Sequence, residues 1–91
     1  MPITTKFKQE LKGKAHKLKP VVIIGMNGLT ANVKNEIDRA LNDHELIKIR
    51  VQAEDRDTRR ELFAEACLSQ KAEAVQLIGG VGVIYRKNKE V

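Results

Sequence analysis

Aromatic residues are scarce in this 91-residue sequence, and their scarcity limits how the chain can bind a nucleic acid. There is no tryptophan, and the only aromatic rings are those of Phe7, Phe63 and Tyr85. Proteins that grip single strands by base stacking present several exposed aromatic side chains. We therefore expect little base stacking and a core built from aliphatic side chains.

Cysteine and long apolar runs are also nearly absent. Cys67 is the only cysteine, which excludes an intramolecular disulfide and a cysteine zinc cluster and is typical of a reducing compartment. No apolar run approaches the length of a membrane span, and the N-terminus lacks the charged-then-apolar layout of a signal peptide. The expected location is cytoplasmic, with no membrane partner.

The residue clusters that catalysis or metal binding would need are not visible. His16 and His44 fall on different predicted elements, and the acidic residues are scattered over helix surfaces. His44 is most simply a partly buried residue at a helix end, and Cys67 a small core residue. We expect a protein that is not an enzyme, with no catalytic residues, metal, cofactor or small-molecule substrate.

Excess positive charge is concentrated at the N-terminal end. The first twenty residues contain six lysines and one glutamate, and so carry the whole net charge of +5; the eleven basic and eleven acidic residues that follow cancel. A basic segment of this kind favours a polyanionic partner such as RNA. The alternative is a lysine-rich helix face that is simply solvated.

Hydrophobic periodicity predicts the element order α-β-α-β-α-β-β. Helices are expected within residues 3–18, 30–44 and 54–71, and strands at 21–24 and 45–53, followed by a hairpin within 73–88 around Gly79 and Gly80. Thr4 or Thr5 caps the first helix and Thr30 the second. The continuous apolar run at 21–24 predicts a strand buried on both faces, whereas the second strand alternates and has one solvent-exposed face.

The strand connections determine the expected architecture. The first strand, second helix and second strand form a right-handed crossover with parallel strands, while the closing hairpin is antiparallel. The predicted fold class is an α+β two-layer sandwich with a four-stranded mixed sheet. Residues 1–91 form one domain, because a chain of this length supports a single modest core.

The segment VVIIGMNGLT, residues 21–30, joins a strand to a helix through two glycines. A helix N-terminus has unpaired amides and a partial positive charge, and glycine at 25 and 28 lets a ligand approach the backbone. The first turn of this helix, Thr30 to Lys34, contains no acidic residue, and Lys34 adds a cation. The segment predicts a phosphate-binding turn; a tight connection that needs glycine only for its backbone is the alternative.

A longer stretch, AHKLKPVVIIGMNGLTANVKNEIDRALNDHELIKIRV, residues 15–51, closely resembles the CRM domain (chloroplast RNA splicing and ribosome maturation), in particular its stand-alone bacterial YhbY-type form. The resemblance extends over essentially the whole chain, through the LIGGVGVIYR hairpin. It implies a fold similar to the C-terminal domain of translation initiation factor three. It also implies an RNA-binding protein that associates with rRNA of precursor large ribosomal subunits and assists ribosome assembly.

The resemblance also implies where RNA is bound. The family's GxxG loop corresponds to residues 25–28, and its inner positions, where many relatives have a basic residue, are Met26 and Asn27 here. Contact would then rest on backbone amides and the Asn27 side chain, with charge supplied by lysines. The expected RNA-binding residues are Gly25, Met26, Asn27, Gly28, Thr30, Lys34, Lys12 and Lys19.

Two questions stay open at this level. Tyr85 and Arg86 either extend the RNA surface or serve the core, with the tyrosine hydroxyl pointing outward. The alternative function is a non-enzymatic adaptor that docks an acidic protein surface through the N-terminal lysine helix. In that case the GxxG turn is purely structural.

Overall fold

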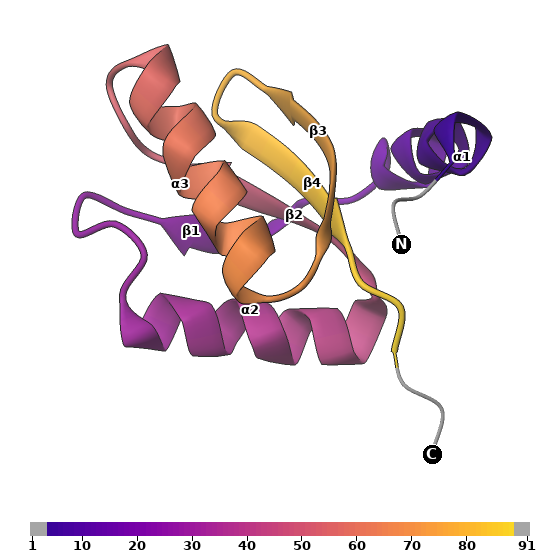
Figure 1. Cartoon of the computed structure of the whole chain (residues 1–91), viewed down its shortest axis with the longest axis horizontal. Helices are drawn as coiled ribbons and strands as arrows, with labels where there is room; N and C mark the ends of the chain where they lie inside the picture. Colours follow the sequence, from indigo (N-terminus) through magenta and orange to yellow (C-terminus); the bar gives the residue numbers. More distant parts are fainter. Residues whose placement is uncertain (1–3, 89–91) are drawn as a thin grey trace.

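The computed structural model describes residues 4–88, which contain three helices and a four-stranded sheet in the predicted order (Figure 1). The elements are α1 (Thr5–Ala15), β1 (Pro20–Ile24), α2 (Ala31–His44), β2 (Leu46–Val51), α3 (Arg56–Ser69), β3 (Glu73–Ile78) and β4 (Val81–Tyr85). The strand order is β1-β2-β4-β3, with β1 parallel to β2 and the other pairs antiparallel. The prediction of an α+β fold with a mixed sheet is confirmed.

A side-chain cap starts each helix. The cap oxygens of Thr4, Thr30 and Asp55 accept hydrogen bonds from the amides of Phe7, Val33 and Thr58, at 3.1, 3.2 and 2.9 Å. Hydrogen bonds from the side chain and the backbone of Thr58 also lower the pKa of Asp55. The two threonine caps confirm the predicted helix starts.

The first helix is shorter than predicted. It ends at Ala15, so Leu18, the last residue of the predicted range 3–18, lies in the connection to β1 and is 37% exposed. Pro20 disfavours helical geometry at the residue before it, and the chain leaves the helix several residues earlier to reach the start of β1. Ile3, the first residue of the predicted range, lies outside the described residues.

The main core lies between one face of the sheet and helices α2 and α3. Its strand residues alternate along β2, where Ile47, Ile49 and Val51 are buried and Arg50 is exposed, as predicted. Helix α2 contributes Ile37 and Leu41. The sheet and these two helices are the two layers of the predicted sandwich.

Helix α1 packs on the opposite face of the sheet. Leu11 and Ala15 contact a second, smaller cluster with Val75 and Val83, and the Phe7 ring meets the Tyr85 ring edge to face, with centroids 5.3 Å apart. Val83 and the main-core residue Ile84 are neighbours in β4, so their side chains point to opposite faces. Helix α1 therefore adds partial cover to the second face.

Strand β1 corrects one prediction. Val22 and Ile24 are buried, but Val21 and Ile23 are 55% and 51% exposed, so the strand is buried on one face only. The reason is its place in the sheet: β1 is an edge strand, and α1 packs against β2 and β3. A continuous apolar run predicts burial on both faces only where a helix covers each face.

Three connections meet at one end of the sheet. Because β1 and β2 are parallel, both end there, and the Gln52 amide donates to the Ile24 carbonyl at 2.9 Å. The turn between β3 and β4 lies at the same end, since the Val51 amide donates to the Gly80 carbonyl. In Figure 1 the β1–α2 loop lies at the left end of the molecule and α1 at the right end. Within residues 4–88, no helix has the length and apolar character needed to cross a membrane.

Candidate nucleic-acid interface

The glycine turn has a defined backbone geometry. The Gly28 amide donates to the Gly25 carbonyl at 3.0 Å, which closes a four-residue turn with Met26 and Asn27 at its corners. Met26 is 86% exposed, and Asn27 is exposed too. Gly28 has a φ of +74°, which favours glycine, whereas a Cβ at Gly25 would make only an ordinary contact, 3.9 Å from Gln52 Oε1. Gly28, rather than Gly25, is the residue that the turn requires.

The start of α2 carries free backbone donors beside this turn. Thr30 uses its side-chain oxygen to cap the Val33 amide, and its own amide donates to the Gly28 carbonyl at 3.1 Å. Among the described residues, no protein group accepts from the amides of Ala31 and Asn32, and the first turn of α2 contains no acidic residue. These two donors and the helix dipole provide a site suited to an anion.

Lys34 is the cation of the predicted set that lies closest in sequence to these amides. Its carbonyl accepts from the Gln70 side chain at 3.1 Å, which joins this turn of α2 to the end of α3. The residue is exposed, and the single ion pair among residues 4–88 is between Arg86 and Asp38. The Lys34 ammonium is therefore free to approach a bound anion.

Lys12 and Lys19 lie elsewhere. Lys12 is on α1, and Lys19 precedes β1 at the end of the strand opposite the glycine turn. Six residues of extended chain separate Lys19 from Gly25, which corresponds to about 20 Å. The structure thus brings together Gly25, Met26, Asn27, Gly28, Thr30 and Lys34, and leaves Lys12 and Lys19 at the other end of the molecule (Figure 1).

The distant lysines have their own surroundings. Lys14, Lys19 and Lys48 line a groove between α1 and the sheet, with Leu18 and Val21 among its apolar residues. Lys48 comes from β2, where the alternating pattern predicted a solvent-exposed strand face. Glu45 also lines this groove, so it is a second surface region in which lysines outnumber acidic residues.

The structure adds basic residues that the sequence pattern did not reveal. They are arginines of α3, at the end of the sheet where the β3–β4 turn lies. Arg56, Arg59 and Arg60 line a small hollow beside the β3–β4 turn. Arg59 is structural, because its Nη1 donates to the carbonyls of Ala53 and Glu54 at 2.8 and 3.2 Å. The run RDTRR, residues 56–60, was the available signal, and the acidic residues around it masked it.

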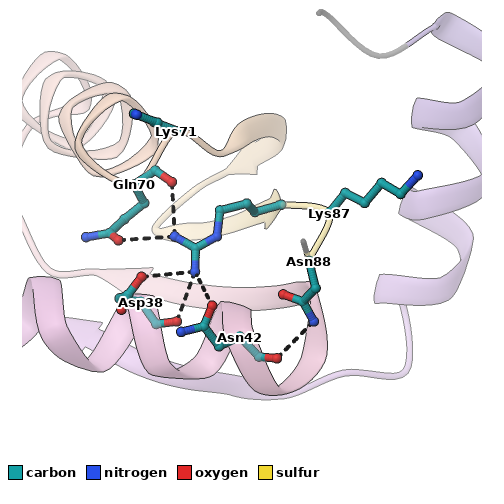
Figure 2. Close-up of a pocket in the computed structure, with 7 residues that line it drawn as sticks. Asp38, Asn42, Gln70, Lys71, Lys87 and Asn88 are labelled. Carbon is teal, nitrogen blue, oxygen red and sulfur yellow. Dashed lines mark hydrogen bonds and ion pairs between the residues drawn. The ribbon is translucent and has the colours of Figure 1, made fainter. Parts of the chain in front are cut away.

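Arg86 is fully engaged within the protein. Its Nη1 donates to the Gln70 carbonyl and Oε1, and its Nη2 donates to the Asp38 carbonyl and the Asn42 side chain and pairs with the Asp38 carboxylate at 3.0 Å. Figure 2 shows these partners converging from α2 and the end of α3. Both terminal nitrogens of Arg86 are occupied, so it is a structural clamp and not a group free to bind phosphate.

The remaining titratable candidates do not form a reactive site. Burial raises the pKa of the Cys67 thiol to about 11, which keeps it protonated and unreactive at neutral pH. His44 is exposed, which corrects its expected partial burial, because it is the last residue of α2 and lies beyond the buried Ile37 and Leu41. In the part of the chain that the structure describes, no group of histidine, cysteine, aspartate and glutamate side chains could hold a metal ion.

Comparisons with known proteins cover nearly the whole chain. A family model described as the CRS1 / YhbY (CRM) domain matches residues 3–86. An RNA-binding protein of Haemophilus influenzae is 49% identical over 88 residues, covering 97% of this chain and 89% of that protein. A protein of Pseudomonas aeruginosa, named a probable RNA-binding protein, is 47% identical over 88 residues, covering 97% and 85%.

A solved structure also matches. The solution structure of a hypothetical protein from Staphylococcus aureus has a TM-score of 0.85 at 38% identity, covering 97% of this chain and 92% of that one. The relatives match along nearly their whole length, and the arrangement of elements is shared as well as the sequence.

Proposed function

Because this chain belongs to the CRS1 / YhbY (CRM) domain family, we propose that it is a non-catalytic RNA-binding protein that recognises the phosphate backbone. The observation that carries the proposal is the start of α2, where two free amides stand beside an exposed glycine turn without an acidic residue. Relatives from two bacteria are named as RNA-binding proteins, which supports the same conclusion.

In the proposed mechanism one phosphate binds at the amides of Ala31 and Asn32, with the Lys34 ammonium beside it. Exposed Asn27 supplies an amide side chain for a neighbouring sugar or phosphate. The aromatic rings are not placed for stacking: Phe63 lies in the main core and Phe7 packs against Tyr85. Selectivity would then come from RNA shape and backbone geometry.

Lys12 and Lys19 provide a second contact region in this proposal. Lys19 lies about 20 Å from the glycine turn, so one short segment of RNA does not reach both regions. A folded RNA, such as a ribosomal RNA, presents phosphates over such a span. The family resemblance and this spacing support rRNA of the precursor large ribosomal subunit as the partner, and assistance in ribosome assembly as the role.

Changing Gly28 to aspartate is expected to weaken RNA binding about tenfold relative to Gly28→Asn. Both side chains tolerate positive φ better than most and have nearly the same size, so the pair differs mainly by one negative charge at the phosphate site. The measurement is filter binding of both variants to purified large-subunit rRNA. Equal affinities would contradict the phosphate site.

The same titration includes a salt series. If about three phosphates are contacted, affinity for RNA falls about 20-fold between about 50 and about 200 mM salt. If the chain is instead an adaptor that docks an acidic protein through α1, the two Gly28 variants should bind equally well, since the glycine turn lies at the other end of the molecule. Circular dichroism of both variants checks that each is folded.

The ribosomal role predicts co-migration with large-subunit particles. When a cell extract is sedimented through a sucrose gradient at low salt, we expect the protein in fractions that contain large ribosomal subunits or their precursors. Gly28→Asp should shift it toward the top of the gradient, and Gly28→Asn should shift it less. If the unmodified chain stays at the top while still binding purified RNA, RNA binding stands and the ribosomal role is wrong.

A further inference from the structure

Helix α1 covers only part of the sheet face opposite α2 and α3. Helix α1 packs Leu11 and Ala15 against Val75 and Val83, which lie toward one end of the strands. The rest of the face lies at the end where β1 and β2 finish. No helix covers it within residues 4–88. We call this surface the open half-face; its members are Ile23, Arg50, Ile78 and Val81, with Val21 and Lys48 at its border, where they also line the groove beside α1.

An apolar row crosses the open half-face. Ile23 pairs in register with Arg50, Arg50 with Val81, and Val81 with Ile78, so these four side chains stand side by side across all four strands. Ile23 is 51% exposed and Ile78 is 66% exposed, with Val81 half-buried between the strands. Ile78 and Val81 are adjacent, and Arg50 separates them from Ile23. Exposed apolar residues gathered around a charged one on a small protein mark an interaction site.

The charge on this surface has one sign. Lys48 and Arg50 alternate with buried Ile47 and Ile49, which places both cations on the open half-face. Among the described strand residues, the one acidic side chain is Glu73, which pairs in register with Tyr85 at the part covered by α1. A partner that buries the apolar row and neutralises these cations must carry apolar and acidic side chains together.

The composition of the surface argues against RNA and against a second copy of the chain. An RNA backbone would neutralise the two cations but leave the exposed Ile23 and Ile78 side chains in water, and no aromatic ring lies on this face to stack a base over them. Two copies packed through this face would bring Lys48 and Arg50 of one chain against the same cations of the other. An acidic protein segment has neither disadvantage.

We propose that the open half-face is the docking site for an acidic amphipathic helix of a partner protein. The helix lies beside α1 and completes the layer that α1 begins, because an apolar sheet face is normally buried against a packed element. Its apolar stripe covers Ile23, Val81 and Ile78, and its carboxylates pair with Lys48 and Arg50. The proposal stands independently of RNA binding at the glycine turn.

The test uses the full ¹⁵N-labelled chain and a synthetic amphipathic helical peptide of about 18 residues with a leucine stripe and glutamates elsewhere. We expect the amide signals of Ile23, Arg50, Ile78 and Val81 to shift on titration. A matched peptide with lysine in place of glutamate should leave them unmoved. Arg50→Glu should weaken binding of the acidic peptide about tenfold, because repulsion replaces attraction. Arg39→Glu, an exposed change on α2 on the other side of the sheet, is the control and should leave it unchanged.

Three results would overturn the proposal. One is that oligouridine, but not the acidic peptide, shifts these amides, which would assign the face to RNA. A second is that the acidic peptide shifts only the α1 lysine region, and a third is that it shifts nothing. Gly28→Asp should leave peptide binding unchanged, so the result is read separately from the RNA experiments.

Discussion

Replacing Arg86 with methionine is expected to lower the free energy of unfolding by about 3 kcal/mol. The guanidinium holds the carbonyls of Asp38 and Gln70 and the Asn42 side chain, and it also pairs with the Asp38 carboxylate. Methionine retains most of the apolar stem but leaves these acceptors without their donor. The Arg86 side chain is only 18% exposed, so water replaces the lost hydrogen bonds incompletely.

Urea denaturation followed by circular dichroism measures this effect. Lys87→Met is the matched control, because the neighbouring residue is exposed, and its loss should change stability by less than about 0.5 kcal/mol. Arg86→Lys should recover only part of the loss, since an ammonium cannot present the planar fork that reaches both helices. Equal stability of Arg86→Met and Lys87→Met would show that the clamp contributes nothing.

The clamp also positions the candidate RNA site. Arg86 ties the middle of α2 to the end of α3, and the Gln70 side chain extends the link to the Lys34 carbonyl, one turn from the free amides of α2. The hydrogen-bond partners of Arg86 lie 16 to 48 residues away from it in sequence. The orientation of the helix that carries the candidate phosphate site therefore depends on Arg86, a residue near the other end of the sequence.

Local patterns predicted the fold well because the signals that set each element lie within a few residues. The threonine caps, the alternation along β2 and the Gly79–Gly80 turn are all local, and all three are confirmed. Burial of β1 was predicted wrongly, since it depends on where α1 packs, and α1 is placed by contacts with β2 and β3. The sequence of residues 21–24 contains no information about that distant packing.

The candidate site shows the same division between local and distant information. The glycine turn, the Thr30 cap and the acid-free helix start follow from ten adjacent residues. The separation of Lys12 and Lys19 from that turn follows from the length and direction of β1. The engagement of Arg86 needs the packed structure, since sequence alone leaves its partners open. Whether these residues contact RNA stays a prediction for the binding experiments.

Gly82→Ala and Gly13→Ala, the same chemical change at two sites, are expected to alter stability in opposite directions. Gly82 is buried in β4 against the Phe63 ring, and a Cβ there would lie 2.6 Å from Phe63 Cδ1, so the ring or the strand must move. We expect a loss of about 2–3 kcal/mol in the free energy of unfolding. Gly13 is exposed on α1 with nothing within 4 Å of the added methyl group, and alanine there should stabilise the protein by about 0.5–1 kcal/mol.

The double variant Gly82→Ala, Phe63→Leu identifies the cause of the loss. If the clash with the ring is responsible, the smaller leucine makes room for the methyl group, and the double variant is more stable than the sum of the two single changes predicts. Thermal and urea unfolding of the four proteins in the cycle measure this coupling. Strict additivity would mean that Gly82 is needed for its backbone conformation. Its φ is not among the positive values in the described chain, so we expect coupling instead.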